Sequence, residues 1–374
     1  MLKAAIVGCG KIADSHAAQM GRIRNCEIVA VCDREPLMAR QLKERFPVKA
    51  AYSNLAELLR EARPDVVHIT TPPESHFQLA GMCLDAGCHV YVEKPFTLTE
   101  QEARKLIAHA HERGLKITAG HDDQFTHVAR RMRALVNSGF LGSSPVHMES
   151  YYCYELADTG YAGALLGDKR HWVRKLPGKL LHNVISHGIA RVAEYFSTDD
   201  VEVLAYGFIS PYLRSRGETE IIDELRVIIT ETGGPTAYFT FSSQMRPSLH
   251  LFRIYGNKNG LILDHDQETL IKLRGARYKS YAEKFVPPVN FARQYLGNLR
   301  TNLRCFLARD FHMKSGMKCL IEAFYQSIVN DGPVPIPYRE IVLTAKIMDA
   351  IFLQLDQGRS VEARVASPQA ASKD

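Results

Sequence analysis

The sequence predicts an α/β protein: an N-terminal domain with a doubly wound parallel sheet, followed by an α+β domain with a mostly antiparallel sheet. Its 374 residues suit two domains. Up to about residue 120, short apolar runs alternate with helix-like stretches, which is the pattern of a parallel sheet with helices on both faces. From about residue 126, strand-like runs follow one another with turn sequences between them, as in an antiparallel sheet.

The first domain is expected to span residues 1–122. Its apolar runs are KAAIVG, EIVAVC, DVVHIT, HVYVE and LKITAG, with a shorter VKAAY after the second helix. The helix-like stretches between them lie near 13–23, 36–46, 54–62, 75–86 and 99–113. Pro36 and Thr99 suit helix starts, and Gly87 and Gly114 suit helix ends.

The second domain is expected to span residues 123–360. A helix-like HVARRMRALVNSGFLG leads into the runs VHMESYYCY, VEVLAYGFI, ELRVIITE, PTAYFTFSS, LHLFRIYG and GLILDHD. Two helix-like segments, MKCLIEAFYQSIVN and YREIVLTAKIMDAIFLQL, close the fold. The composition of the last residues, 361–374, is typical of a flexible tail.

Composition excludes several classes of protein. The net charge of +6 is concentrated in residues 271–318, which hold eleven lysines and arginines but two acids, so we expect no general nucleic-acid binding. No apolar run approaches the roughly 18 residues of a membrane span, and we expect no signal peptide before the first strand. The eight cysteines form no CxxC pair, which predicts reduced thiols, a cytoplasmic location and no metal site.

The first apolar run ends in GCGKIA, a glycine-rich turn typical of dinucleotide binding. Gly8 allows the tight turn and Gly10 lets a pyrophosphate approach the backbone, while Ala13 is small enough for helix–strand packing. We expect Lys11 and Ile12, at the start of the following helix, to lie beside the phosphates.

The acidic residue after the second strand predicts the choice of cofactor. Asp33 can accept hydrogen bonds from both hydroxyls of an adenosine ribose and would repel a 2′-phosphate, which favours NAD over NADP. Arg34 stands next to it and keeps NADP open as the less favoured cofactor.

Parallel strands deliver their carboxyl ends to one edge of the sheet, where ligands bind. The TTPPESH turn and the charged end of the HVYVE strand therefore join the phosphate turn at that edge. From these two segments we expect cofactor contacts from Thr70, Thr71, Pro72, His76, Glu93 and Lys94. Pro95 restricts the backbone beside Lys94 and helps to hold its amine toward the cleft.

Two segments, GCGKIA and TTPPESHFQLAGMCLDAGCHVYVEKPFTLTEQEA, resemble the Gfo/Idh/MocA family of NAD(P)-dependent oxidoreductases. The likeness continues in NSGFLG and PGKLLHNVISHG. The resemblance implies a Rossmann domain followed by an open-faced domain that shapes the substrate site and forms oligomer contacts, in a homodimer or homotetramer.

Lys94 and His187 are the expected acid/base residues. A lysine near a cationic nicotinamide and away from solvent has a lowered pKa, so it can bind or deprotonate a hydroxyl. In HNVISHGIARVAEYF, a stripe of apolar residues faces the core, with Asn183 and His187 on the opposite side. The family commonly carries a carboxylate four residues before this histidine. Asn183 occupies that position, which leaves His187, Lys94 or a water as the base.

Two further positions are expected at the substrate site. Gln124 stands where many relatives carry an arginine, and His171 with Trp172 could line a sugar site, although core packing of Trp172 is an equal alternative. We therefore predict an NAD-dependent oxidoreductase that interconverts a ring secondary alcohol and ketone of a sugar, cyclitol or nucleotide-linked sugar. A redox-neutral sugar lyase or glycosidase that uses NAD, and a non-enzymatic cofactor-binding protein, stay open as alternatives.

The basic segment contains NFARQYLGNLRTNLRCFLARDF, which reads as an amphipathic helix bordered by Arg293, Arg300 and Arg304. The sequence leaves three interpretations open. The helix packs on the sheet or on an oligomer partner, forms an anion-binding lid for a nucleotide–sugar diphosphate, or attaches reversibly to an anionic membrane surface. The last is the least favoured of the three.

Overall fold

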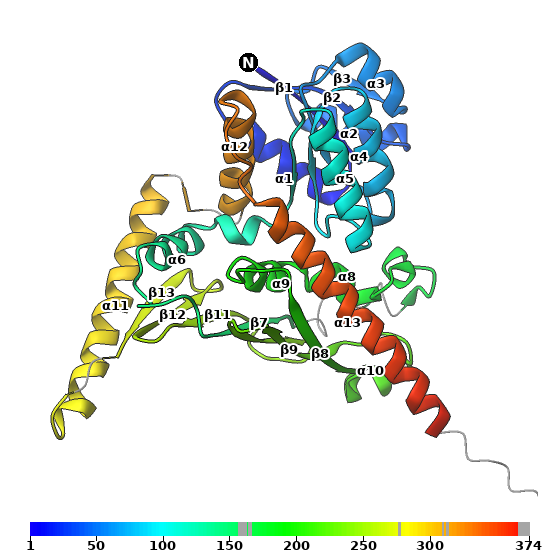
Figure 1. Cartoon of the computed structure of the whole chain (residues 1–374). Helices are drawn as coiled ribbons and strands as arrows, with labels where there is room; N and C mark the ends of the chain where they lie inside the picture. The colour runs from blue at the N-terminus through cyan, green and yellow to red at the C-terminus, as the bar shows by residue number, and fades with distance from the viewer. Residues whose placement is uncertain (156–162, 164–166, 276–277, 309, 312–313, 366–374) are drawn as a thin grey trace, which may run out of the picture.

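The computed structural model describes residues 1–155, 163, 167–275, 278–308, 310–311 and 314–365. Two sheets organise them. Figure 1 shows the N-terminal domain at the top, the second sheet at the bottom, and helices α6, α8 and α9 between the two layers.

The N-terminal domain is the predicted doubly wound parallel sheet, with strand order β3-β2-β1-β4-β5-β6. Its strands are β1 (Leu2–Val7), β2 (Cys26–Cys32), β3 (Ala50–Tyr52), β4 (Val66–Ile69), β5 (His89–Val92) and β6 (Ile117–Ala119). Its helices are α1 (Lys11–Met20), α2 (Pro36–Arg45), α3 (Leu55–Ala62), α4 (His76–Asp85) and α5 (Glu100–Glu112). Asn54 and Thr99 cap α3 and α5 by accepting hydrogen bonds from backbone amides of the first turn.

The core of this domain includes a helix from much later in the chain. Helix α12 (Ser315–Val329) places Leu320, Ile321 and Phe324 in the same buried cluster as β1, β4 and β5. Figure 1 shows α12 standing against α1. The hydrophobic core of the first domain therefore contains residues from both sides of the predicted boundary at residue 122.

The second sheet has the order β13-β12-β11-β7-β10-β9-β8. Its strands are β7 (His147–Cys153), β8 (Val201–Phe208), β9 (Glu224–Glu231), β10 (Thr236–Ser242), β11 (Leu249–Tyr255), β12 (Asn259–Asp264) and β13 (Thr269–Arg274). Every pair is antiparallel except β7 with β10, which confirms the mostly antiparallel prediction. Strand β13 was not predicted, because its sequence TLIKLR merges into the basic segment.

One face of this sheet is covered and the other is open. On the covered face pack α6 (His127–Asn137), α8 (Lys179–Val184) and α9 (Ser186–Ala193), whose apolar residues share a core with the strands. The predicted stripe of Ile185, Ile189, Val192 and Phe196 lies in that core. On the open face, Leu204, Tyr206, Ile228 and Tyr238 are exposed.

The remaining helical elements complete the connections. They are α10 (Pro211–Arg214), α11 (Ala282–Leu307), α13 (Tyr338–Val365) and the 3-10 turns η1 (Pro73–Ser75), η2 (Asp122–Phe125) and η3 (Trp172–Lys175). Helix α13 contacts α5 of the first domain and α9 and β8 of the second. It continues through Val365, into the stretch predicted as a tail; residues 366–374 lie outside the described chain.

Helix α11 covers the edge strand β13 through two side-chain amides. Asn298 accepts a hydrogen bond from Leu270 N at 3.1 Å and donates one to Leu270 O at 3.0 Å. Gln294 does the same with Lys272, at 2.8 and 3.2 Å. The two amides thus satisfy the backbone groups that an edge strand would otherwise leave unpaired.

Replacement of Asn298 by alanine is expected to lower the free energy of unfolding by about 2 kcal/mol, because buried backbone groups of Leu270 lose their partner. Urea denaturation measures the loss, and hydrogen exchange should localise it to β13 and α11. Arg300→Ala, at an exposed position of the same helix, is the control and should stay within about 0.5 kcal/mol of the wild type. Unchanged exchange at Leu270 in Asn298→Ala would contradict this account of the edge.

Candidate active site

A cavity of about 790 Å³ lies at the carboxyl edge of the parallel sheet. Among the residues predicted for the cofactor, those lining it are Gly8, Gly10, Asp33, Arg34, Thr70, Thr71 and Pro72. Gly8 has φ +93°, and a Cβ there would lie 2.6 Å from Thr71 Cγ2, so only glycine fits this turn. A Cβ on Gly10 would have no atom within 4 Å, so the helix start faces open space.

The carboxylate of Asp33 is fixed at the rim of this cavity by two backbone amides. Cys9 N donates to Oδ2 at 2.7 Å and Glu35 N donates to Oδ1 at 2.9 Å. Each oxygen keeps a lone pair for a ligand hydroxyl. A glycine turn with free space, a helix N-terminus and an oriented carboxylate together fit a dinucleotide.

The other residues predicted for the cofactor do not line this cavity. Lys11 is exposed and Ile12 is half-buried at the start of α1. His76 is fully buried, with Nδ1 2.9 Å from Pro95 O and Nε2 2.8 Å from Thr71 O. It therefore holds the loop after β4 against the loop after β5 and so fixes the positions of both loops at the site.

Glu93 belongs to a buried chain of polar groups that fixes the backbone beside Lys94. Its Oε1 lies 2.8 Å from His16 Nε2, and its Oε2 accepts from Lys94 N at 3.1 Å. His16 Nδ1 lies 2.9 Å from His68 Nδ1, and His68 Nε2 lies 2.8 Å from Tyr325 OH. Burial alone would raise the pKa of Glu93, but the hydrogen bond and charge of His16, with Lys94, bring it down to about 2. Glu93 is therefore an anion that orients the chain at the end of β5.

Lys94 reaches from the end of β5 to the second domain. Its Nζ donates to the backbone carbonyl of Asn183 at 3.0 Å, and the side chain is half-buried. Burial lowers the pKa of Lys94, while the charges of Glu93 and Asp122 oppose that shift. The amine is thus held at the junction of the two domains, where its neutral form is more accessible than in water.

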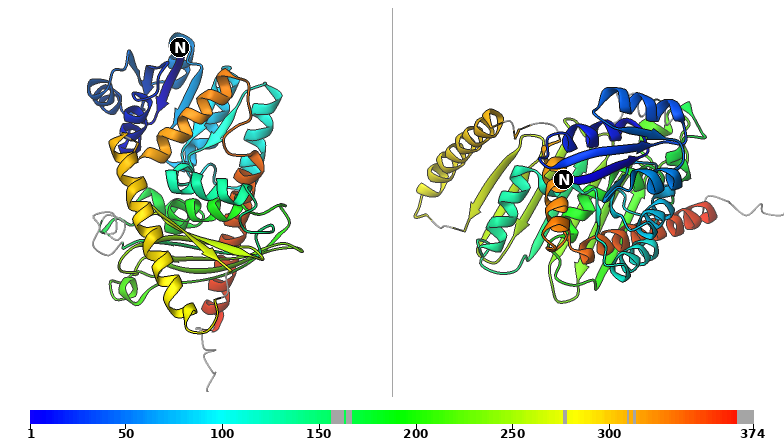
Figure 2. Two further views of the ribbon diagram at one scale, coloured as in Figure 1. Left: turned by 90° about the vertical axis from the view of Figure 1, so that its left-hand side faces the viewer. Right: turned by 90° about the horizontal axis from the view of Figure 1, so that it is seen from above.

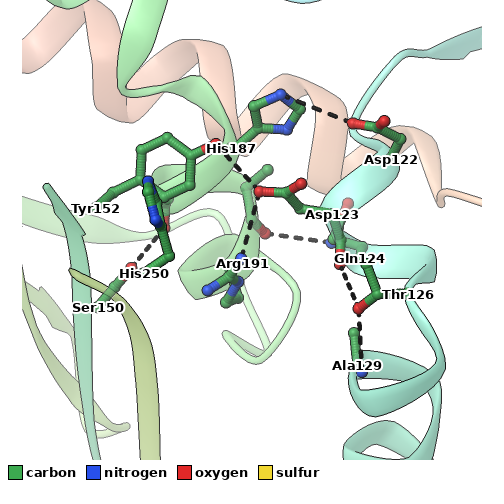
Figure 3. Close-up of polar contacts among 12 residues, drawn as sticks. Asp122, Asp123, Gln124, Thr126, Ala129, Ser150, Tyr152, His187, Arg191 and His250 are labelled. Atoms are coloured by element: carbon green, nitrogen blue, oxygen red, sulfur yellow. Dashed lines mark hydrogen bonds and ion pairs between the residues drawn. The ribbon is translucent and has the colours of Figure 1, made fainter. Parts of the chain in front are cut away.

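His187 faces two carboxylates that follow β6. Figure 3 shows His187 on α9 opposite Asp122 and Asp123, with Tyr152 and Arg191 directed at Asp123. His187 Nε2 lies 3.8 Å from Asp122 Oδ1, a separation that substrate binding commonly shortens in catalytic sites. Burial lowers the pKa of His187 to about 4, so its imidazole is neutral at pH 7.

The two carboxylates differ in protonation. Burial and the neighbouring Asp123 charge raise the pKa of Asp122 to about 7. Burial would also raise the pKa of Asp123, but His187, His265 and Arg191 hold it well below its usual range. Tyr152 OH donates to Asp123 Oδ2 at 3.1 Å, and Arg191 Nη2 lies 3.5 Å from the same oxygen. Asp123 is therefore a fixed anion and Asp122 a group that can exchange a proton near neutral pH.

The sequence of the N-terminal domain matches a known protein family. Residues 2–121 match the family model described as "Oxidoreductase family, NAD-binding Rossmann fold". Residues 2–121 are therefore similar to the NAD-binding domain of the Gfo/Idh/MocA oxidoreductases. This assignment confirms the resemblance seen in the glycine turn and in the Glu93-Lys94-Pro95 element.

Individual relatives match different shares of this chain. D-glucoside 3-dehydrogenase of Escherichia coli K12 is 32% identical over 142 residues, which is 38% of this chain and 40% of the relative. The crystal structure of the WlbA dehydrogenase from Bordetella pertussis, in complex with NADH and UDP-GlcNAcA, is similar over 96% of both chains, with a TM-score of 0.76 and 16% identity. UDP-N-acetylglucosamine 3-dehydrogenase from Acidithiobacillus ferrooxidans covers 95% of this chain and 99% of its own, with a TM-score of 0.70 and 20% identity.

The matches to solved structures establish the fold of the whole chain. The alignments to the first curated relatives span 36–59% of those proteins' lengths, and the two solved structures share too little sequence to say more than fold. The substrate class is therefore inferred from the residues of this chain's own site.

Three predicted substrate residues make contacts that the sequence did not predict. The side-chain amide of Gln124 donates to Ala190 O at 3.3 Å and to Glu194 Oε2 at 3.1 Å, so it ties η2 to α9. Asn183 offers its backbone carbonyl to Lys94. Trp172 lines the cofactor cavity and stacks on His171, with ring centroids 5.8 Å apart.

Asp122 and Asp123 were not predicted as site residues, although GHDDQF follows the β6 strand at the ligand-binding edge. That position was the available signal, because carboxyl ends of parallel strands carry ligand contacts. Within the described part of the chain, Asp122, Asp123 and His187 are the one group of three whose possible metal-ligand atoms lie within 4.8 Å of one another. Lys314 Nζ, 4.0 Å from Asp122 Oδ2, supplies a positive charge at the same place.

Proposed function

We propose that the protein is an NAD-dependent dehydrogenase that interconverts a ring secondary alcohol and a ketone of a sugar-like substrate. The observation that carries the proposal is the position of Lys94. Its half-buried amine stands at the same sheet edge as the cofactor cavity and within electrostatic reach of Asp122, Asp123 and His187. A hydride transfer from CH–OH needs a base for the hydroxyl proton, and this group of residues provides one.

The residues have separate parts in the proposed reaction. Gly8, Gly10 and Asp33 would hold the dinucleotide, whose nicotinamide accepts or returns a hydride when bound. Lys94, with a lowered pKa, binds and orients the reacting hydroxyl. His187 is neutral and accepts the hydroxyl proton, since burial keeps it from being protonated already. Asp123 stabilises the imidazolium that results.

Asp122 supplies the carboxylate that position 183 lacks. In the family, an acid commonly stands four residues before the histidine, but Asn183 cannot take a proton. Asp122 reaches the same imidazole from η2, 3.8 Å away. Its pKa of about 7 suits a group that receives a proton from His187 and passes it on.

A sugar, a cyclitol or a nucleotide-linked sugar is the proposed substrate class. The names of the relatives support it: one is a D-glucoside 3-dehydrogenase and another was solved in complex with NADH and UDP-GlcNAcA. The polar side chains around Lys94 can bind several hydroxyls, and the face of Trp172 is suited to stack on a ring at the mouth of the cavity.

A panel of sugars, cyclitols and sugar nucleotides, tested with NAD and with NADP at 340 nm, is the experiment that checks the proposed reaction. Mass spectrometry of cofactor released from the purified protein accompanies it. A substrate that is converted without net absorbance change, by protein that carries NAD, would replace the dehydrogenase with a redox-neutral lyase or glycosidase. Absence of any turnover in a cofactor-bound protein would leave a non-enzymatic binding protein.

Asp33→Ala is expected to weaken NAD binding by roughly ten- to a hundredfold, because a charge-assisted hydrogen bond to the ribose is lost. NADP binding should change less or improve, since the repulsive carboxylate is gone and Arg34 remains. Calorimetric titration of both cofactors measures the ratio, and Glu112→Ala, at an exposed position at the end of α5 and outside the cofactor cavity, is an acid control. Equal losses for NAD and NADP would contradict the proposed preference.

We propose two further properties of the whole protein. The exposed residues Leu204, Tyr206, Ile228 and Tyr238 on the open sheet face would form the contact of a homodimer or homotetramer. The cysteines in the described chain are free thiols, which supports a reducing, cytoplasmic location. No helix among the described residues is both long and apolar enough to cross a bilayer.

A further inference from the structure

Helix α11 is amphipathic in the opposite sense from a helix that packs on a core. Its polar side chains Gln294, Asn298 and Asn302 point at the sheet and at the loop beside it. Its large apolar side chains point outward, and eight are more than half exposed: Phe285, Val289, Tyr295, Leu296, Leu299, Leu303, Phe306 and Leu307. Spacings of three and four residues place these on one broad stripe.

Nothing in the described chain covers this stripe. In the left view of Figure 2, α11 faces the viewer along the edge of the second sheet, and in the right view it is the outermost element on its side. Exposed apolar surface of this extent marks a binding surface rather than an ordinary solvated helix. The inward amides fix the orientation of the helix, so the stripe cannot turn into the protein.

The border of the stripe is positively charged. Arg293, Arg300 and Arg304 follow one side of it, at helical positions that share a face, and no acidic residue lies between Lys284 and Leu307. Beside Arg293, a cavity of about 500 Å³ opens between α11 and β13. Arg131, Lys272 and Arg274 also line it, and no acid does. The apolar stripe therefore adjoins a pocket with four cations.

We propose that α11 is a membrane-surface docking helix that binds anionic phospholipids. The apolar stripe enters the boundary between headgroups and acyl chains, while the arginine border and the basic pocket receive headgroup phosphates. This combination of an apolar face and a cationic border is how interfacial helices bind bilayers. The inference does not depend on the proposed dehydrogenase reaction.

A second copy of the chain suits the stripe less well than a lipid surface. In an antiparallel pair of α11 helices, the arginine border of one would lie against the same border of the other, with no carboxylate on the facing stretch to neutralise it. Like charges in contact destabilise such a pairing. An anionic bilayer supplies the missing counter-charge along the whole border.

The test is sedimentation of the full-length protein with phosphatidylcholine vesicles that contain or lack phosphatidylglycerol, in low and in high salt. Wild-type protein should bind the anionic vesicles, lose most binding in high salt, and ignore the neutral vesicles. Leu296→Glu/Leu299→Glu should abolish binding. Arg293→Gln/Arg300→Gln/Arg304→Gln should weaken it by roughly a hundredfold, since each cation near the surface adds about fivefold.

Matched controls separate a specific surface from general stickiness. Leu37→Glu/Leu353→Glu places the same charges on other exposed apolar side chains and should leave vesicle binding unchanged. Soluble glycerophosphate should compete only weakly, because the apolar stripe contributes nothing to its binding. Circular dichroism of each variant checks folding.

Two outcomes would overturn the proposal. One is wild-type protein that fails to sediment with anionic vesicles. The other is a wild-type protein that binds no vesicles and whose oligomer dissociates in the Leu296→Glu/Leu299→Glu variant, seen as a lower particle mass in analytical ultracentrifugation. That result would make the stripe an interface between copies of this chain.

Discussion

Lys94→Ala is expected to lose roughly 10²- to 10⁴-fold in kcat while it still folds and binds the dinucleotide. Lys94 is not among the residues that line the cofactor cavity, and among the described residues its amine donates to the carbonyl of Asn183. Its removal therefore takes away a group that acts on the reacting hydroxyl and leaves the cofactor cavity intact. Steady-state kinetics with the substrate found in the panel, and calorimetric titration with NAD, measure the two properties separately.

Lys94→Arg is the matched control for this prediction. A guanidinium keeps the positive charge but does not release a proton in the accessible pH range. It should restore part of the substrate affinity and little of kcat. A Lys94→Ala protein with wild-type kcat and normal cofactor binding would remove the lysine from the mechanism and with it the main support for a dehydrogenase.

Asp122→Asn is expected to lower kcat/KM by about 10²-fold and to remove a pH dependence centred near pH 7. A carboxylate must be deprotonated to receive a proton, so wild-type activity for alcohol oxidation should rise with pH as Asp122 ionises. The asparagine cannot ionise, and the rise should disappear. The measurement is kcat/KM for alcohol oxidation between pH 5 and pH 9.

Two companion variants test whether the carboxylate of Asp122 itself takes part in the proton transfer. Asp123→Asn removes a neighbouring negative charge, so the pKa of Asp122 should fall and the rise should move to lower pH without vanishing. Asn183→Asp in the Asp122→Asn background returns an acid to the position common in the family and should recover at least tenfold of the lost rate. An Asp122→Asn enzyme with an unchanged pH profile would show that the carboxylate has no part in proton transfer.

The strands and helices of the N-terminal domain, and their parallel arrangement, could be predicted because their signals are local. Apolar runs alternate with capped helices. The turn after β1 requires a glycine, because Gly8 has φ +93°, and that glycine is visible in the sequence. The contact of Gly8 with Thr71, in contrast, joins distant segments. It depends on the strand order, which places β4 beside β1 and which was not predicted from the sequence.

The parts that could not be predicted depend on contacts between distant segments. Asp122 is adjacent to His187 only because η2 and α9 meet between the two sheets. Glu93 looked like a cofactor ligand, but its partner is His16 of α1, which no spacing rule connects to it. The apolar stripe of α11 could be predicted from the sequence, but its outward orientation could not. That orientation depends on side-chain amides of α11 that bond to β13, a strand that was not predicted because it lies in a basic stretch.

The hydrogen bond from His68 to Tyr325 has a consequence for any attempt to cut or transplant this protein. A fragment ending near residue 122 would contain every glycine and acid of the nucleotide turn, yet it would expose the side of the sheet that Phe324 and Tyr325 seal. His68, and through it His16 and Glu93, would then be open to water. A nucleotide-binding fragment of this chain would therefore have to include residues 315–329. During synthesis, almost the entire polypeptide must be made before Lys94, at the end of β5, reaches its final position.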